Sequence, residues 1–379
     1  MIKKTGLMVM AVFLLVALFS PGLAQAGDGL RVLDNSVQAE FPYRLSFSLS
    51  AESDVNITDI RLCYQVDRIN FARVSSEAYI DFVPATSVSI DWALEMIKIG
   101  GLPPGSSLEY WWTVEDVDGD RTATLPARIV FDDNRYSWQS LTEGKVTLYW
   151  YQGDNSFAGE LMLAAQQALE RLNEYTAAEL EQPVKLYVYA DARDLQGSMI
   201  YPQEWTGGVA FTRYGIMAIG IAPEKLDWGK RAIAHELTHL VIHQVTLNPY
   251  NEIPTWLDEG LAMRSEGPLG QEFQVHLDRA IAKDSLFSVR SLASPFSTDA
   301  DKSYLSYAQS YSLVEYLIST YGKDRMFELL DTLSEGSTYD GALNRVYGFD
   351  SDDLEQLWRE YLMSPAETVE QMGVLSGRG

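Results

Sequence analysis

The sequence predicts two domains, an all-β sandwich followed by a mixed α+β domain whose C-terminal half is helical. Three observations predict this organisation. Short segments before residue 135 alternate apolar and polar residues, which is typical of half-buried strands. Residues 228–245 form an apolar segment of helical length, and segments with helical spacing fill the chain after residue 259. A chain of 379 residues is long enough to bury two cores.

The N-terminus has the pattern of a secretory signal. Two lysines precede an apolar stretch at 7–19, and residues 24–26 read Ala-Gln-Ala, an A-x-A cleavage site. The apolar stretch is shorter than the roughly 20 residues that span a bilayer. We expect removal of 1–26 and an extracellular or cell-surface protein with no stable membrane insertion; an uncleaved anchor is the alternative.

The region 27–135 is expected to be a sandwich of about seven strands, of the immunoglobulin or fibronectin type. The alternation is clearest at 41–49, 60–66, 89–92, 110–114 and 127–131. Such a module commonly positions or binds a partner, which the sequence does not identify.

An acidic segment at 116–120 is compatible with two structures. A calcium loop would need further oxygen ligands elsewhere in the chain. Asp118-Gly119 is a strong signal for a two-residue hairpin turn between strands. The hairpin is therefore the expected structure.

The second domain, 136–363, begins after the polar segment 132–135. Strands are expected at 146–151 and 184–189, a helix at 156–180, and a hairpin with arms at 208–212 and 216–221. After residue 259 helices are expected at 269–283, 303–321, 323–334, 338–346 and 351–363. The tail 364–379 has no firm pattern.

The apolar helix carries a motif for metal chemistry, because residues 235–239 read His-Glu-Leu-Thr-His. On a helix His235 and His239 share a face, so both imidazoles can reach one metal ion. Two neutral imidazoles hold zinc well, and Glu236 beside them can take a proton from the attacking water. The chain has four histidines, three of them in this helix. The alternative is a satisfied polar cluster inside a buried helix.

A zinc hydrolase needs a third protein ligand and one open position. Glu259 is the best candidate, since the 19 residues between it and His239 suit a loop and a return helix. Pro254 stands at a favourable first-turn position. Gly260 and Ala262 would let the two helices approach closely. The alternative for Glu259 is a solvated helix carboxylate.

His243 competes with Glu259 for the third ligand position. Two helical turns separate it from His235, about 12 Å along the axis. Proteases with a third His after this motif break the helix with a glycine first, whereas residues 240–242 are Leu-Val-Ile. We therefore expect His243 to support the site or the fold without binding metal.

These segments resemble the gluzincin zinc metallopeptidases, and most closely the bacterial peptidase MA-like type. The resemblance implies a zincin (thermolysin-like) domain with one Zn²⁺ per chain. It implies that His235, His239 and Glu259 are the zinc ligands and that Glu236 is the general base. In such enzymes an edge strand pairs with extended substrate, which makes 216–221 the expected peptide-binding edge.

The resemblance also implies a tyrosine that stabilises the oxyanion. Tyr307 is the best aligned position and Tyr311, one turn later, is the alternative; in a chain with 21 tyrosines either can equally be a core residue. Two departures are visible. Met263 stands where thermolysin-like enzymes place an Asp, and Ala218 stands where aminopeptidases of this branch place an amine-binding Glu. The second departure favours internal cleavage.

The function expected from the sequence is an exported zinc endopeptidase that acts on a peptide or protein. The net charge of −24 argues against nucleic acid and anionic membranes as partners. Cys63 is the single cysteine, so no internal disulfide can form. The alternatives are a non-catalytic binding or assembly protein built on the same scaffold, and a zinc hydrolase with a non-peptide substrate.

Overall fold

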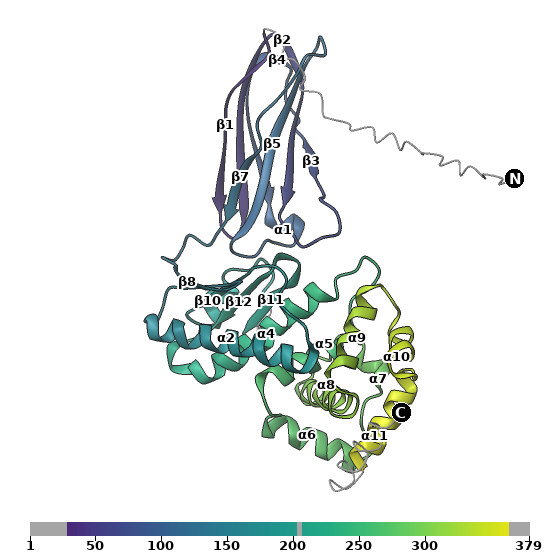
Figure 1. Ribbon diagram of the computed structural model, residues 1–379. Coiled ribbons are helices and arrows are strands. Elements are labelled where there is room, and N and C mark those ends of the chain that lie inside the picture. Colours follow the sequence, from purple (N-terminus) through teal and green to yellow (C-terminus); the bar gives the residue numbers. More distant parts are fainter. Residues whose placement is uncertain (1–28, 203–206, 364–379) are drawn as a thin grey trace, which may run out of the picture.

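The computed structural model describes residues 29–202 and 207–363, which form a β-rich part stacked on a mixed α/β part (Figure 1). The expected signal segment 1–26 and the tail 364–379 lie outside the described residues. Among the described residues, none of the helices combines the length and the apolar character that crossing a membrane requires.

The N-terminal part is one hydrogen-bonded sheet of seven strands organised around the long strand β2 (Arg44–Val66). The other strands are β1 (Arg31–Glu40), β3 (Ser76–Tyr79), β4 (Ala85–Glu95), β5 (Ser106–Asp116), β6 (Arg121–Ala123) and β7 (Ala127–Phe131). The first half of β2 pairs with β1 and β4, and its second half pairs with β5 and β3. A short helix, α1 (Met96–Ile99), follows β4. Because its two halves have different neighbours, β2 links both sides of the domain.

Alternating side chains give this part its own core. Phe47 on β2 and Tyr110 on β5 meet edge to face with ring centroids 5.1 Å apart, and Trp112 is completely buried. The strand-like alternation in the sequence thus corresponds to an inward and an outward face. The acidic segment 116–120 forms a hairpin turn as expected, but three residues, 117–119, connect the paired strands instead of two. Asp116 accepts the backbone N–H groups of Asp118 and Asp120.

A second sheet begins the other part, in the order β11-β12-β10-β9-β8. Its strands are β8 (Gln139–Glu143), β9 (Val146–Trp150), β10 (Val184–Tyr189), β11 (Gly208–Phe211) and β12 (Ile216–Gly220). The strands β9, β10 and β12 run parallel, and β8 and β11 are antiparallel edges. The predicted boundary between 135 and 136 falls in the segment between β7 and β8.

The expectation that 216–221 is an edge is wrong. β12 lies between β10 and β11, so the first arm of the hairpin, β11, is the edge strand. The second arm pairs in parallel with β10, and this pairing closes its outer side.

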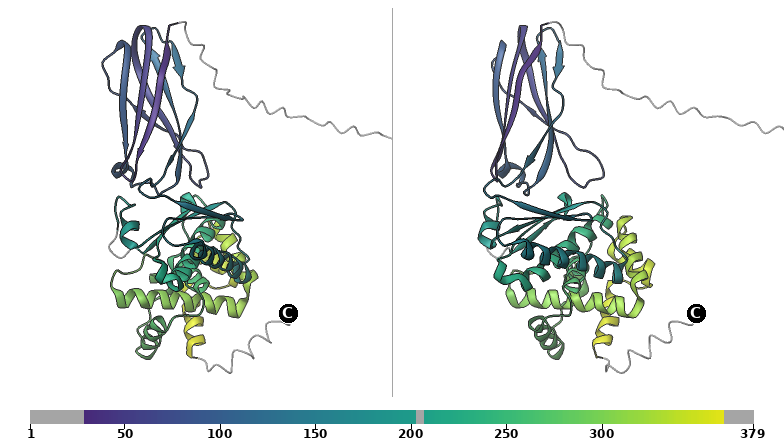
Figure 2. Two further views of the ribbon diagram at one scale, coloured as in Figure 1. Left: turned by 90° about the vertical axis from the view of Figure 1, so that its left-hand side faces the viewer. Right: turned by 60° about the vertical axis from the view of Figure 1, so that its left-hand side comes forward.

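The two faces of this sheet have different neighbours. Helices α2 (Asn155–Thr176) and α4 (Leu226–Val245) cover one face and share its apolar core (Figures 1 and 2). The other face carries aromatic side chains, including Tyr187, and lies toward the N-terminal part. A Cβ on Gly105 would stand 2.2 Å from the Tyr187 hydroxyl, so the loop before β5 touches this face.

Further contacts join the two parts. The Lys185 ammonium donates to the carbonyl of Gly105 at 2.7 Å, and the N–H of Ile69 donates to the carbonyl of Arg213 at 2.7 Å. The loop between β2 and β3 therefore reaches the turn between β11 and β12.

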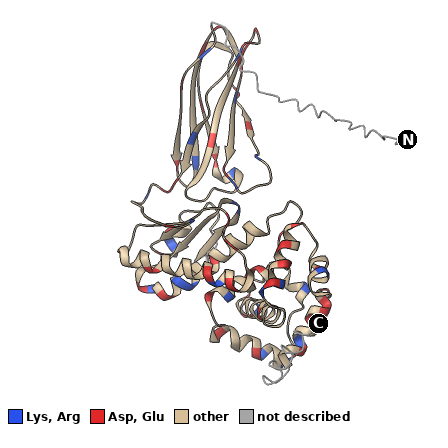
Figure 3. Cartoon of the chain, in the orientation of Figure 1, with Lys and Arg blue, Asp and Glu red and all other residues tan. Residues whose placement is uncertain are grey.

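The C-terminal half is helical, and Asp and Glu are distributed over its helices (Figure 3). Its helices are α5 (Thr255–Glu266), α6 (Gln271–Ala282), α7 (Val289–Leu292), α8 (Ala300–Tyr321), α9 (Lys323–Ser334), α10 (Tyr339–Tyr347) and α11 (Ser351–Met363). The short helix α3 (Ala192–Gln196) lies earlier, after β10. A Cβ on Gly260 would stand 2.4 Å from the carbonyl oxygen of Ser310. Gly260 thus allows α5 to approach α8, not α4 as expected.

Candidate metal centre

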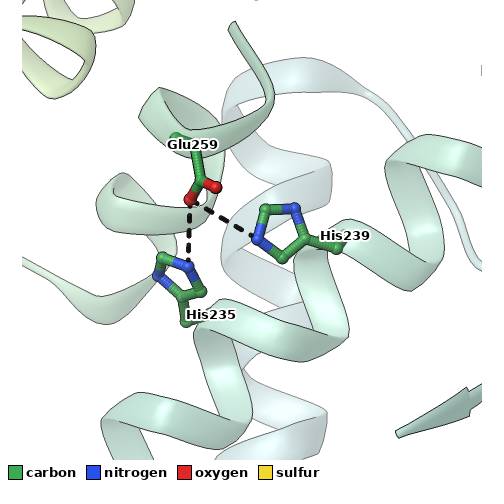
Figure 4. A group of neighbouring side chains, drawn as sticks. All are labelled: His235, His239 and Glu259. Carbon is green, nitrogen blue, oxygen red and sulfur yellow. Dashed lines mark ion pairs between the residues drawn. The ribbon is translucent and has the colours of Figure 1, made fainter. Parts of the chain in front are cut away.

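The helix α4 brings His235 and His239 to one face inside the protein. Its other faces are apolar and buried through Ile233, Ala234, Leu237, Leu240, Val241 and Ile242. Because His235 and His239 are four residues apart, their imidazoles point the same way, toward α5 (Figure 4).

The loop after α4 returns the chain so that Glu259 faces both histidines. Asn248 fixes this loop, since its side chain accepts the N–H groups of Tyr250 and Asn251 and donates to the carbonyl of Leu333. Oε2 of Glu259 lies 3.3 Å from Nε2 of His235 and 3.6 Å from Nε2 of His239 (Figure 4).

The three converging atoms suit a metal ion. They lie within 4.8 Å of one another, and Oε2 of Glu259 is buried with no hydrogen-bond donor among the described residues. A buried carboxylate oxygen without a donor is costly unless a cation or donor satisfies it. Two imidazole nitrogens and one carboxylate oxygen are a ligand set of catalytic zinc sites.

Carboxylates hold the far side of each imidazole. Nδ1–H of His235 donates to Oε1 of Glu266 at 2.8 Å, and Nδ1–H of His239 donates to Oδ1 of Asp258 at 2.8 Å. These bonds fix the tautomers, so both Nε2 lone pairs point toward Glu259. The far-side carboxylates therefore orient the two nitrogens.

The charge balance of the cluster is negative. Burial lowers the pKa of both histidines, but Glu259 and Glu266 raise that of His235 well above its ordinary value, and Asp258 and Glu259 raise that of His239 to about 9. Burial raises the pKa of Asp258, but its hydrogen-bonded histidines hold it well below the ordinary value. Protons and a metal ion therefore compete for this site.

His243 lies behind the converging atoms. Its Nε2–H donates to Oδ2 of Asp258 at 3.0 Å, while the other oxygen of Asp258 accepts from His239. The polar atoms with which His239, Asp258 and His243 face one another are thus already paired in hydrogen bonds.

Glu236 lies between this cluster and the edge strand β11. A Cβ on Gly208 would stand 3.1 Å from Oε1 of Glu236, and the N–H of Ala210 donates to the Glu236 carboxylate. Burial raises the pKa of Glu236, although His235 and His239 lower it in part. A carboxylate with a raised pKa is a better proton acceptor.

Of the two candidate tyrosines, Tyr307 lies beside the cluster. Its ring centroid is 6.4 Å from that of His235, and Tyr307 and Glu259 line one cavity. Burial, followed by the charges of Glu259 and Glu236, raises the Tyr307 pKa. Tyr311, one turn later, is not among the described residues that line this cavity.

Sequence reasoning missed Glu266. The pattern pointed to position 263, four residues after Glu259, where the buried Met263 stands. Glu266 is seven residues after Glu259 and therefore lies on the same helix face two turns later. A search at this spacing would have found it.

A model of the Peptidase MA superfamily matches residues 164–364, more than half of the chain. The matched range contains α4, α5 and α8, and with them every residue of the cluster. The comparison with curated proteins found no match.

Three of the solved structures that share some similarity differ widely in their described roles. Wild-type OgpA from Akkermansia muciniphila is 12% identical, with a TM-score of 0.22 over 30% of this chain and 31% of that chain. The sporulation control protein Spo0M from Bacillus subtilis is 13% identical, with a TM-score of 0.18 over 38% of this chain and 56% of that chain. The polysaccharide deacetylase BC0361 from Bacillus cereus is 12% identical, with a TM-score of 0.20 over 45% of this chain and 57% of that chain. The chain spans about a third of OgpA, and these TM-scores are too low to support an inference about fold or function.

Proposed function

The chain belongs to the Peptidase MA superfamily, and on that premise we propose that it is an exported zinc-dependent endopeptidase. The observation that carries the proposal is the convergence of His235, His239 and Glu259 next to Glu236. A binding scaffold would have no need of Glu236 beside such a cluster.

In this proposal His235, His239 and Glu259 hold one zinc ion. When bound, zinc lowers the pKa of water and polarises a carbonyl oxygen. Glu266 and Asp258 keep the two imidazoles in the tautomer that presents Nε2.

Glu236 acts as the general base and then as the proton donor. Its carboxylate takes a proton from the attacking water and passes it to the leaving amine. Burial raises its pKa, so the carboxylate takes the proton from water more readily than an exposed glutamate would.

The substrate backbone is proposed to lie along β11. This strand is the open edge of the sheet, and the N–H of Ala210 points toward Glu236 rather than toward β12. An extended peptide adds to such an edge through backbone hydrogen bonds. β11 contains no acidic residue to bind a free substrate amine, which favours internal cleavage. Tyr307 is proposed to stabilise the oxyanion.

Two finer features complete the proposal. The N-terminal sheet is proposed to be a sandwich of the immunoglobulin or fibronectin type, and the second part a thermolysin-like domain. Export is proposed from the A-x-A site at 24–26 and the apolar stretch before it.

The test measures metal content and peptide cleavage on the purified chain and on Glu236→Gln. We expect one zinc per chain in both proteins and cleavage only in the native one. Glu174→Gln, an exposed change on α2, is the control and should cleave normally. Equal cleavage by Glu236→Gln would refute the mechanism. Zinc without cleavage of any peptide would support a binding role or a non-peptide substrate.

A further inference from the structure

A cavity of about 630 Å³ lies beside Glu259, where α6, α8 and the segment before α8 meet. Four aromatic residues line it, namely Phe273, Phe296, Tyr304 and Tyr307. We call it the aromatic pocket. Because Glu259 also lines it, the pocket is continuous with the candidate metal centre.

The rings of the pocket form one connected wall. The centroids of Phe296 and Tyr307 are 5.2 Å apart with the rings at 89°, and those of Phe273 and Tyr304 are 5.1 Å apart. Phe273 also meets Tyr307 edge to face at 6.4 Å. These are favourable arrangements for aromatic pairs, so the wall is formed before any ligand enters.

Contacts behind the wall hold two of its rings. His276 stacks on Tyr304 with centroids 5.2 Å apart, and its Nε2 lies 3.2 Å from Oδ1 of Asp301. Phe296 packs against the main core of the second part. A pocket whose walls are fixed in this way loses less entropy when it binds.

The chemistry of the lining excludes most charged occupants. Among the described residues that line it, Glu259 is the only charged side chain, and the polar ones carry neutral hydroxyl groups: Thr255, Ser297, Thr298 and Ser303. A substrate carboxylate would find no Lys or Arg among the described residues that line the pocket, and it would face Glu259. An apolar side chain instead buries its surface against the four rings.

We propose that the aromatic pocket binds a bulky neutral side chain, of the Phe, Tyr, Leu or Met class, on a substrate residue that flanks the scissile bond. This inference rests on the proposed peptidase function and adds its substrate class. The volume of the aromatic pocket lies in the range of ligand-binding sites, so a Gly or Ala side chain would leave its rings largely uncovered. We expect kcat/KM to favour Phe over Gly by about tenfold to a hundredfold at one flanking position.

The test uses peptides in which Phe, Leu, Lys, Glu or Gly occupies each of the two positions that flank the cleaved bond. The pocket variants are Phe273→Ala and Phe296→Ala, and Ser303→Trp fills the pocket from α8. Phe327→Ala, on the exposed side of α9, is the matched control. The pocket variants should lose the preference for Phe and Leu over Gly, measured as the ratio of kcat/KM values within each variant; the control should keep the native preference.

A binding measurement separates this inference from the proposed function. N-acetyl-phenylalaninamide and N-acetyl-glycinamide are titrated into the Glu236→Gln chain, with and without Phe296→Ala, and followed by NMR. Binding of the Phe amide that Phe296→Ala weakens at least tenfold supports the pocket even if no peptide is cleaved. Cleavage with equal rates for Phe and Gly at both positions would overturn the pocket and leave the peptidase intact. A preference for Lys at both positions, or no binding of either amide, would also overturn it.

Discussion

Glu266, at the last position of α5, accepts a hydrogen bond from Nδ1 of His235 at 2.8 Å. The same helix therefore supplies Glu259 to one side of the imidazole and Glu266 to the other. One helix thus positions both the candidate ligand Glu259 and the carboxylate that orients His235.

Removing this second contact should weaken metal binding. We expect Glu266→Gln to lower zinc affinity about 10- to 100-fold, because the uncharged amide orients His235 less well and leaves Nε2 less basic. Competition against a chelating dye measures the affinity. Glu328→Gln, a change at a half-buried residue of α9 that pairs with Arg325, should leave it unchanged. An unaltered affinity in Glu266→Gln would mean that the contact does not act on the metal.

Gly208 keeps β11 clear of the Glu236 carboxylate. In Gly208→Ala the new methyl group would stand 3.1 Å from Oε1 of Glu236 and 3.2 Å from Ile219, so the carboxylate must move. We expect kcat to fall about 10- to 100-fold, since misplacing a catalytic group by a fraction of an ångström is costly, while zinc content stays at one per chain. Gly159→Ala on α2, where a Cβ meets nothing within 4 Å, is the control. An equal loss of kcat in Gly208→Ala and Gly159→Ala would point to a general effect on folding.

Gly260 should be essential for the contact between α5 and α8. A Cβ there would approach the Ser310 carbonyl oxygen to 2.4 Å and the Val314 side chain to 2.6 Å, and backbone atoms cannot easily give way. We expect Gly260→Ala to lower the free energy of unfolding by about 1–3 kcal/mol. Gly159→Ala should raise it slightly, as alanine favours a helix. Denaturant titration of both variants measures the difference. A stable Gly260→Ala would show that the helices can separate without cost.

Asp340 should make the helical half sensitive to acid. Ser351 and then Arg290 hydrogen-bond to this carboxylate and lower its pKa below the ordinary value. A lowered pKa contributes stability above the unfolded pKa of about 4, and this contribution is lost as the pH falls through the folded pKa. Asp340→Asn should therefore be less stable than the native chain at pH 6, and the gap should narrow toward pH 3. Unfolding titrations at both pH values measure it, with Asp34→Asn on β1 as the control. A gap that stays constant with pH would contradict this role.

The helical half was the part most completely predicted from the sequence. The bounds of α9 and α11 agree with the expected 323–334 and 351–363, and β10 agrees with 184–189. The two helices each bury one side, so their apolar residues recur at the helical period, whereas β10 is a short run of mostly buried residues. The strand β8 was missed because all of its residues are exposed and no alternation marks it.

Long-range relationships set the limit of prediction. The histidine spacing indicates a shared helix face, and the structure brings His235, His239 and Glu259 together. Strand order within the sheet depends on pairings between distant segments, which is why the edge was assigned to β12 instead of β11. The partner of Gly260 was misjudged for the same reason, since Ser310 is 50 residues away along the chain.

The loop between β2 and β3 brings the N-terminal part close to the candidate metal centre. Ile69 and His243 line the same small cavity, and from His243 a chain of hydrogen bonds runs through Asp258 to His239. The N-terminal part thus lines the space at the outer end of this chain of hydrogen bonds, where His243 lies. Removing the N-terminal part would expose that end to water and raise the local dielectric constant, so the candidate ligands His235, His239 and Glu259 would experience different electrostatics in the second part alone.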